Sequence, residues 1–147
     1  MSIPSSRRAF LLAIPAVLLV VSAATAGFMT KVPEGLDLSL SKLSDAGLYR
    51  VTLEPTAEPL TTGRMQSVTV AVEAANGKPV EDAEIAVSGG MPQHGHGLPT
   101  RPQVTQNLGQ GRYVIEGVKF NMGGWWTFSL GVKGKPGSDI VTFNLVL

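Results

Sequence analysis

WWTFSLGV, residues 125–132, carries the clearest strand pattern in the chain, because apolar side chains alternate with small or polar ones. Successive side chains of a β-strand point to opposite faces, so Trp126, Phe128 and Leu130 share one face. Trp125 falls on the other. The pattern predicts a half-buried strand in which one tryptophan ring enters the core and the other faces outward or toward a site.

The same two-residue period recurs on both sides of this stretch, between turns rich in glycine and proline. The strands that it predicts span residues 49–53, 68–73, 83–87, 113–118 and 140–147. Turn sequences such as NGKP at 76–79 and GKPG at 134–137 separate them. Since residues 27–147 show no convincing helical stripe, residues 47–147 are expected to form an all-β, immunoglobulin-like antiparallel β-sandwich.

Residues 27–46 are expected to link this domain to the start of the chain. Lys31-Val32-Pro33-Glu34-Gly35 breaks any regular pattern. The leucines that follow, from Leu36 to Leu43, alternate loosely with polar residues. They predict either a short amphipathic segment that packs on the domain or a first edge strand.

Residues 1–26 have the layout of an export signal, with Arg7 and Arg8, an apolar stretch at 10–21 and small residues up to Ala26. The apolar stretch falls within the roughly 7–15 residues typical of a signal peptide and is shorter than the ~20 of a spanning helix. We expect either a cleaved signal or a retained membrane anchor. SRRAFLL at 6–12 resembles a twin-arginine signal, and a general secretory signal is the alternative. Both place the domain in the periplasm or at the outer face of a bacterial cytoplasmic membrane.

The composition excludes several classes of site. The chain has no cysteine, so disulfides, thiolate zinc sites and cysteine nucleophiles are impossible. Its formal net charge is +1 and its basic residues do not cluster with aromatic ones. Nucleic acid is therefore not expected as a partner.

Both histidines of the chain lie in GMPQHGHG, residues 90–97. Imidazole binds copper and zinc well, and the soft thioether of methionine selects copper, above all Cu(I). Met91, His94 and His96 therefore form a candidate copper site in a glycine-rich loop. Met122, in FNMGGWW at 120–126, is a fourth donor if both bends lie at the same end of the sandwich. The alternative is that the histidines are solvated and the methionines fill the core.

Other residues near these bends are candidates for supporting roles. Gln93 is placed to orient an imidazole by a hydrogen bond. Trp125 or Trp126 is placed to shield a bound cation through its ring face. Ordinary solvation of Gln93 and core packing of the tryptophans are the alternatives.

Several of these pieces occur together in a known family. They are AEIAV at 83–87 with the preceding NGKPVEDA at 76–83, Met91-Pro92-x-His94-x-His96, Gly111-Arg112-Tyr113, and Phe120-x-Met122-x-Gly124-x-Trp126. Together they resemble the YtkA-like/FixH-like domain of bacterial envelope proteins over residues 47–147. The resemblance implies an immunoglobulin-like sandwich with a metal-handling role, notably copper delivery or oxidase assembly. It assigns Met91, His94, His96 and Met122 as ligands.

The expected function is that of an exported or anchored copper-binding protein, a chaperone or carrier that passes copper to an envelope acceptor or an oxidase-assembly protein. The alternative is a metal-free interaction or accessory module of an envelope complex. Membrane contact is expected only through the N-terminal segment. An enzyme is not expected, because the chain has no cysteine nucleophile and its serines lack a recognisable His/Asp partner pattern.

Overall fold

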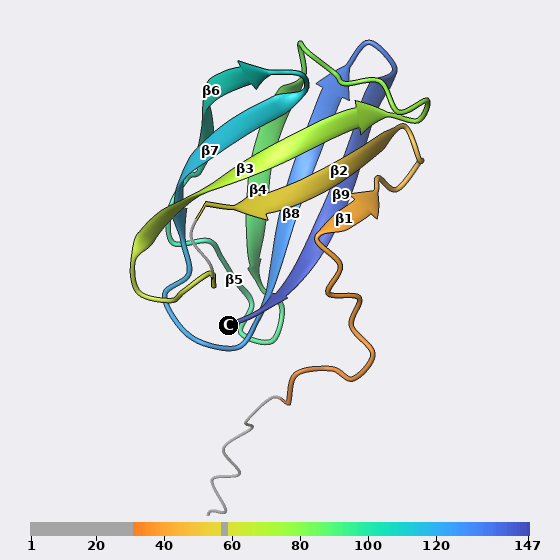
Figure 1. Cartoon of the computed structure of the whole chain (residues 1–147). Helices are drawn as coiled ribbons and strands as arrows, with labels where there is room; N and C mark the ends of the chain where they lie inside the picture. The colour runs from red at the N-terminus through yellow and green to blue at the C-terminus, as the bar shows by residue number, and fades with distance from the viewer. Residues whose placement is uncertain (1–30, 57–58) are drawn as a thin grey trace, which may run out of the picture.

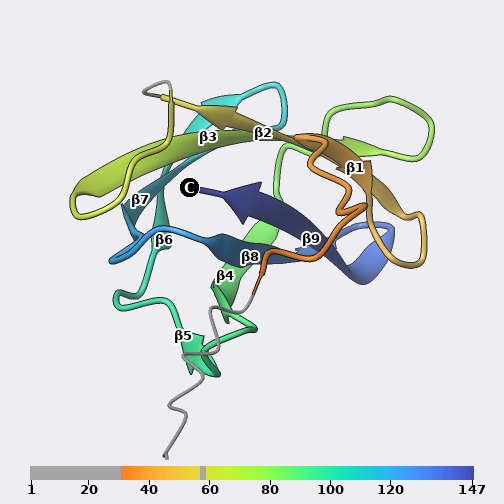
Figure 2. The ribbon, with the colours of Figure 1, turned by 90° about the horizontal axis from the view of Figure 1, so that it is seen from below.

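The computed structural model describes residues 31–56 and 59–147, which form two stacked antiparallel sheets (Figures 1 and 2). The expected signal or anchor at residues 1–26 lies outside the described residues. Within 31–56 and 59–147, no helix is long and apolar enough to cross a membrane.

The first sheet has five strands in the order β1-β2-β3-β7-β6 and the second has four in the order β5-β4-β8-β9. In the first sheet the strands are β1 (Ser41–Leu43), β2 (Tyr49–Pro55), β3 (Met65–Ala74), β7 (Arg112–Lys119) and β6 (Gln103–Gly109). In the second they are β5 (His96–Gly97), β4 (Glu84–Met91), β8 (Trp125–Gly134) and β9 (Gly137–Val146).

The strand order is that of an immunoglobulin constant-type sandwich. When the short edge strands β1 and β5 are set aside, the remaining strands can be lettered A to G in chain order. The sheets then read A-B-E-D and C-F-G, which is the constant-type arrangement. The predicted immunoglobulin-like antiparallel β-sandwich is therefore confirmed.

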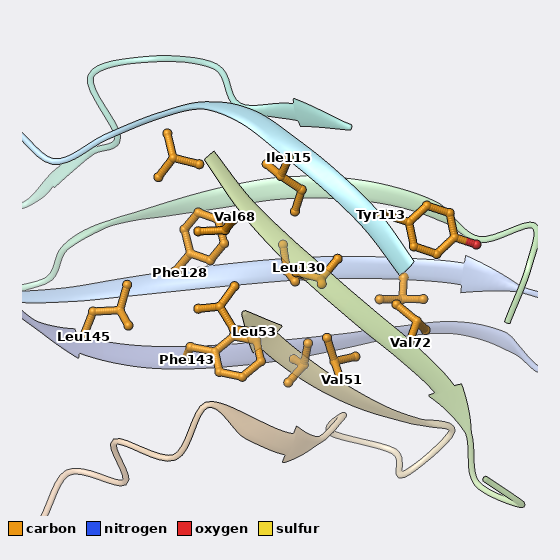
Figure 3. Packing of buried hydrophobic residues seen from close by; sticks show 14 of the residues in the cluster. Val51, Leu53, Val68, Val72, Tyr113, Ile115, Phe128, Leu130, Phe143 and Leu145 are labelled. Carbon is orange, nitrogen blue, oxygen red and sulfur yellow. The ribbon is translucent and has the colours of Figure 1, made fainter. Parts of the chain in front are cut away.

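Alternating side chains of the paired strands fill the space between the sheets. Trp126, Phe128 and Leu130 of β8 are each at most 1% exposed, so the face predicted from WWTFSLGV is the core face. Figure 3 shows Phe128 and Leu130 of β8 close to Val68 of β3. A single apolar core between the sheets holds the domain together.

The segment before the first predicted strand is partly structured. Ser41–Leu43 forms β1 and pairs with β2, with Ser41 opposite Thr52. The edge-strand alternative is thus the one observed, and the folded domain begins before residue 47. Leu43 is 54% exposed, so this short strand adds an edge to the sheet and little to the core.

The buried carboxylate of Asp139 joins β9 to the turn before β2. It accepts hydrogen bonds from the backbone amides of Ala46, Leu48 and Ile140. Hydrogen bonding to Ser44 and to these amides lowers the pKa of Asp139 from its ordinary 3.8 to about 2, against the opposing effect of burial. The fold therefore favours the ionised form.

Because the folded-state pKa of Asp139 is depressed, its contribution to stability is present above about pH 4 and is lost as the pH falls toward 2. We expect Asp139→Asn to lower stability at neutral pH and to flatten the pH dependence of stability between pH 4 and 2. Urea unfolding across this range checks the prediction. Asp45→Asn, an exposed acid on the same turn, is the matched control. If the free energy of unfolding fell equally with pH in Asp139→Asn and in the wild type, the prediction would be wrong.

Candidate functional site

GMPQHGHG, expected to be a loop, forms a tight β-hairpin. β4 continues through Met91 and pairs with β5, so that Met91 lies opposite His96 and Gly90 opposite Gly97. The amides of His94 and Gly95 both donate to the Met91 carbonyl, at 3.0 Å each. The turn therefore holds the two histidines in a defined position at the end of β4.

Gly90 allows the two strands of the hairpin to approach closely. A Cβ atom at Gly90 would lie 2.3 Å from the backbone oxygen of His96, well inside contact distance. A Cβ atom at Gly97 would meet its nearest neighbour, the Gly89 oxygen, at 3.4 Å. Glycine is thus required on the β4 side and not on the β5 side. The sequence signal was the pair Gly89-Gly90 within a strand, which often marks close backbone approach.

We expect Gly90→Ala to push β5 away from β4 and to displace His96, because a backbone atom blocks the added methyl group. Gly97→Ala is the matched control, since it adds the same group to the partner strand without overlap. Chemical shifts of the two imidazoles report the displacement. Large shift changes in Gly97→Ala, or none in Gly90→Ala, would contradict this account of the hairpin.

The two bends that carry the candidate ligands meet at one end of the sandwich. A Cβ atom at Gly124 would lie 2.9 Å from the Met91 Cε atom, so the side chain of Met91, the last residue of β4, reaches the bend before β8. Gly124 also exchanges two backbone hydrogen bonds with Leu147, at 2.8 and 3.1 Å. We call this end, which contains the β4–β5 hairpin, the 120–124 bend and Leu147 just after β9, the hairpin end (Figure 1).

The two imidazoles lie beside each other on the exposed side of the hairpin. The ring centroids of His94 and His96 are 5.9 Å apart with an interplanar angle of 27°. His96 Nδ1 lies 3.1 Å from the Gly97 carbonyl. A carbonyl can only accept a hydrogen bond, so Nδ1 is the donor in this contact, and Nε2 is the ring nitrogen that points away from it.

The separation of the two rings suits one shared ion. A metal–nitrogen bond is about 2 Å long and a ring nitrogen lies roughly 1 Å from its centroid, so two imidazoles on one ion have centroids up to about 6 Å apart. The observed 5.9 Å between His94 and His96 fits this limit. Both side chains are exposed, so their rings can rotate to aim nitrogens at the ion.

The two methionines have different environments. Met91 is 1% exposed and belongs to the core. Because it lies opposite His96 in the β4–β5 pair, the two side chains leave the hairpin on the same face. Met122 is 40% exposed, and its carbonyl accepts a hydrogen bond of 3.0 Å from the Trp126 indole. Within the described ranges, no three His, Asp or Glu side chains gather into a ligand cluster. Any metal here would depend on the imidazoles and a thioether.

The two tryptophans separate as their positions on β8 predict. Trp126 is fully buried, and its ring centroid lies 5.7 Å from that of His96 with an interplanar angle of 65°. Trp125 faces outward and donates a hydrogen bond of 3.0 Å to Asn144 Oδ1. Of the two rings considered for shielding, Trp126 is the one next to an imidazole.

Gln93 contacts the N-terminal segment and not an imidazole. Its Nε2 atom donates to the Lys31 carbonyl at 2.6 Å. The expected role of Gln93 in orienting a histidine is therefore not what the structure shows. The amide instead connects the hairpin to the chain that precedes β1.

The fold and the hairpin together define an immunoglobulin-like β-sandwich domain with two neighbouring exposed imidazoles at one end. A family model described as YtkA-like matches residues 43–131, and the chain belongs to this family, which is not a known family of enzymes. Comparison with curated proteins gave no match. Among solved structures, the ZirS C-terminal domain aligns over 97% of each chain at 14% identity, with a TM-score of 0.38.

Proposed function

We propose that this protein is an exported or membrane-anchored envelope protein that binds copper through its hairpin and acts as a copper chaperone or carrier. The observation that supports this most strongly is the pair of imidazoles, His94 and His96, held 5.9 Å apart on an exposed turn. The proposed ligands are these two imidazoles with a thioether from Met91 or Met122. Copper is favoured over zinc because thioether ligands select it.

The environment of the histidines suits an ion that is bound and then released. Both imidazoles are exposed, so an acceptor protein can approach the ion and replace its ligands one at a time. Met122 offers an accessible thioether on the neighbouring bend, whereas Met91 lies beneath the hairpin. The Trp126 ring beside His96 gives the site an apolar, rigid floor, and aromatic rings near a cation attract it.

The second candidate function is a metal-free interaction module of an envelope complex. The burial of Met91 favours it, because a thioether with 1% exposure behaves as an ordinary core side chain. In that case the hairpin would be a contact surface for a protein partner, and metal ions would not change the stability of the domain.

Thermal unfolding of the purified protein with and without Cu(I) separates the two candidates. An ion that binds only the folded state at 100 times its Kd adds about 2.7 kcal/mol of stability. We therefore expect copper to raise the Tm by on the order of 10 °C. The double variant His94→Ala/His96→Ala should show no such rise. An unchanged Tm of the wild type, or an equal rise in the double variant, would favour the metal-free module.

A further inference from the structure

The chain before β1 is fixed along the second sheet and reaches the hairpin. Asn144 of β9 donates to the Asp37 carbonyl at 3.1 Å, and Trp125 of β8 in turn donates to Asn144. Further back, Gln93 of the hairpin donates to the Lys31 carbonyl at 2.6 Å. In Figure 1 this segment descends from β1 toward the hairpin end. We call residues 31–40 the strap.

The strap determines which end of the domain lies near the N-terminal apolar stretch. Residues 22–30 join the apolar stretch at 10–21 to the strap, and an extended chain of this length spans at most roughly 35 Å. The far end of the sandwich lies one strand length beyond the hairpin end, and the ten residues of β8 span about 33 Å. If residues 10–21 sit in a membrane, the hairpin end lies nearer to its surface than the far end does, because the strap enters the described domain at the hairpin end.

The hairpin end also carries side chains that suit a lipid surface. Met65 lies opposite Lys119 in the β3–β7 pair, and Arg64 immediately precedes Met65 in the chain. Arg101 and Met65 flank Gly117, since a Cβ atom there would lie 3.8 Å from the Arg101 oxygen and 3.9 Å from Met65 Cε. Met65 is 58% exposed.

Acidic residues partly balance this charge. Among the described residues at this end, Glu34 pairs with Lys31 and Glu116 lies beside Gly117, while Asp37 in the strap pairs with Lys42. The turns at the far end carry Asp45, Glu81 and Asp82. The far-end turns also carry Lys78 and Lys135, so their acids outnumber their lysines, whereas at the hairpin end Lys31, Arg64, Arg101 and Lys119 outnumber the acids.

We infer that the hairpin end docks on the surface of the membrane that holds the N-terminal segment, with Arg64, Arg101 and Lys119 against anionic lipid headgroups. Three basic side chains bind such a surface weakly by themselves, but a short tether supplies an effective concentration in the millimolar range. The inference rests on the membrane-anchored form of the proposed function. It directs His94 and His96 toward the membrane, where an integral membrane acceptor would meet them.

Because the chain has no cysteine, a single introduced thiol can report this orientation. The full chain is reconstituted without copper into phosphatidylcholine/phosphatidylglycerol vesicles that contain a headgroup-labelled quencher lipid. A fluorophore is attached at Asn121→Cys, in the 120–124 bend, or at Lys135→Cys, in the β8–β9 turn at the far end. We expect several-fold stronger quenching at position 121 than at position 135.

The charge contact is tested on the Asn121→Cys label. The triple reversal Arg64→Glu/Arg101→Glu/Lys119→Glu should remove most of the quenching. The matched far-end reversal Lys78→Glu/Lys133→Glu/Lys135→Glu should leave it unchanged. Equal quenching at both ends, no quenching at position 121, or insensitivity to the first reversal would overturn the inference and leave copper binding untouched. Failure of the chain to float with the vesicles would overturn it together with the anchored form of the proposed function.

Discussion

Replacing Trp126 with alanine should lower the free energy of unfolding by about 3–5 kcal/mol, the usual cost of removing a fully buried large aromatic side chain. Trp126 is 0% exposed and packs against Phe120 with ring centroids 5.2 Å apart. Its indole also donates the hydrogen bond that ties the Met122 carbonyl to β8. The substitution therefore removes core packing and one anchor of the 120–124 bend together.

Trp125→Ala provides the matched control for this prediction. Trp125 is half-buried on the outer face, so its loss should cost only about 1–2 kcal/mol, from partial burial and the hydrogen bond to Asn144. Urea unfolding of both variants measures the difference. Equal losses for the two neighbouring tryptophans would mean that β8 does not alternate between core and solvent as described.

Gly111→Ala should destabilise the protein by about 1–3 kcal/mol more than Gly77→Ala. The two glycines have nearly the same backbone conformation, with φ of +72° and +77°, so alanine incurs a similar backbone penalty at both. They differ in surroundings. A Cβ atom at Gly111 would lie 2.4 Å from the Val72 oxygen, whereas nothing lies within 4 Å of one at Gly77.

The overlap at Gly111 cannot be relieved cheaply. The Val72 oxygen already accepts a hydrogen bond of 2.9 Å from Val80, and Val72 lies in the centre of the first sheet. Chemical denaturation of the two variants tests the prediction. An equal loss of stability for both variants would show that backbone conformation alone explains the cost. The turn between β6 and β7 would then not pack against β3 as closely as described.

The sequence predicted the central strands because each has one face in the core. β8 alternates between buried and half-buried residues from Trp125 to Val132, and this two-residue period is what sequence patterns detect. β6 was missed because it is an edge strand with little burial on either face. Its residues from Thr105 to Leu108 are all exposed, so no apolar period marks it.

The candidate site was predicted less completely than the fold. The sequence left open whether the bends at Met91 and Met122 lie at the same end of the sandwich, and the fold brings both to the hairpin end. Residue types alone could not show that Met91 is a core side chain or that Gln93 binds the strap. Both depend on the pairing of Met91 with His96, which required the close approach at Gly90.

A competition titration with Cu(I) is the sharpest test of the proposal that His94 and His96 bind copper. We predict that the wild type binds copper with a submicromolar Kd. Removing a group that only hydrogen-bonds a metal ligand weakens metal binding by roughly tenfold or more. Because the imidazoles are proposed to bind the ion directly, His94→Ala and His96→Ala should each weaken copper binding by more than about tenfold. Gln93→Ala, in the same turn but bound to Lys31, is the matched control and should leave the affinity unchanged. Wild-type binding no tighter than micromolar, or histidine variants that bind as tightly as the wild type, would contradict the claim.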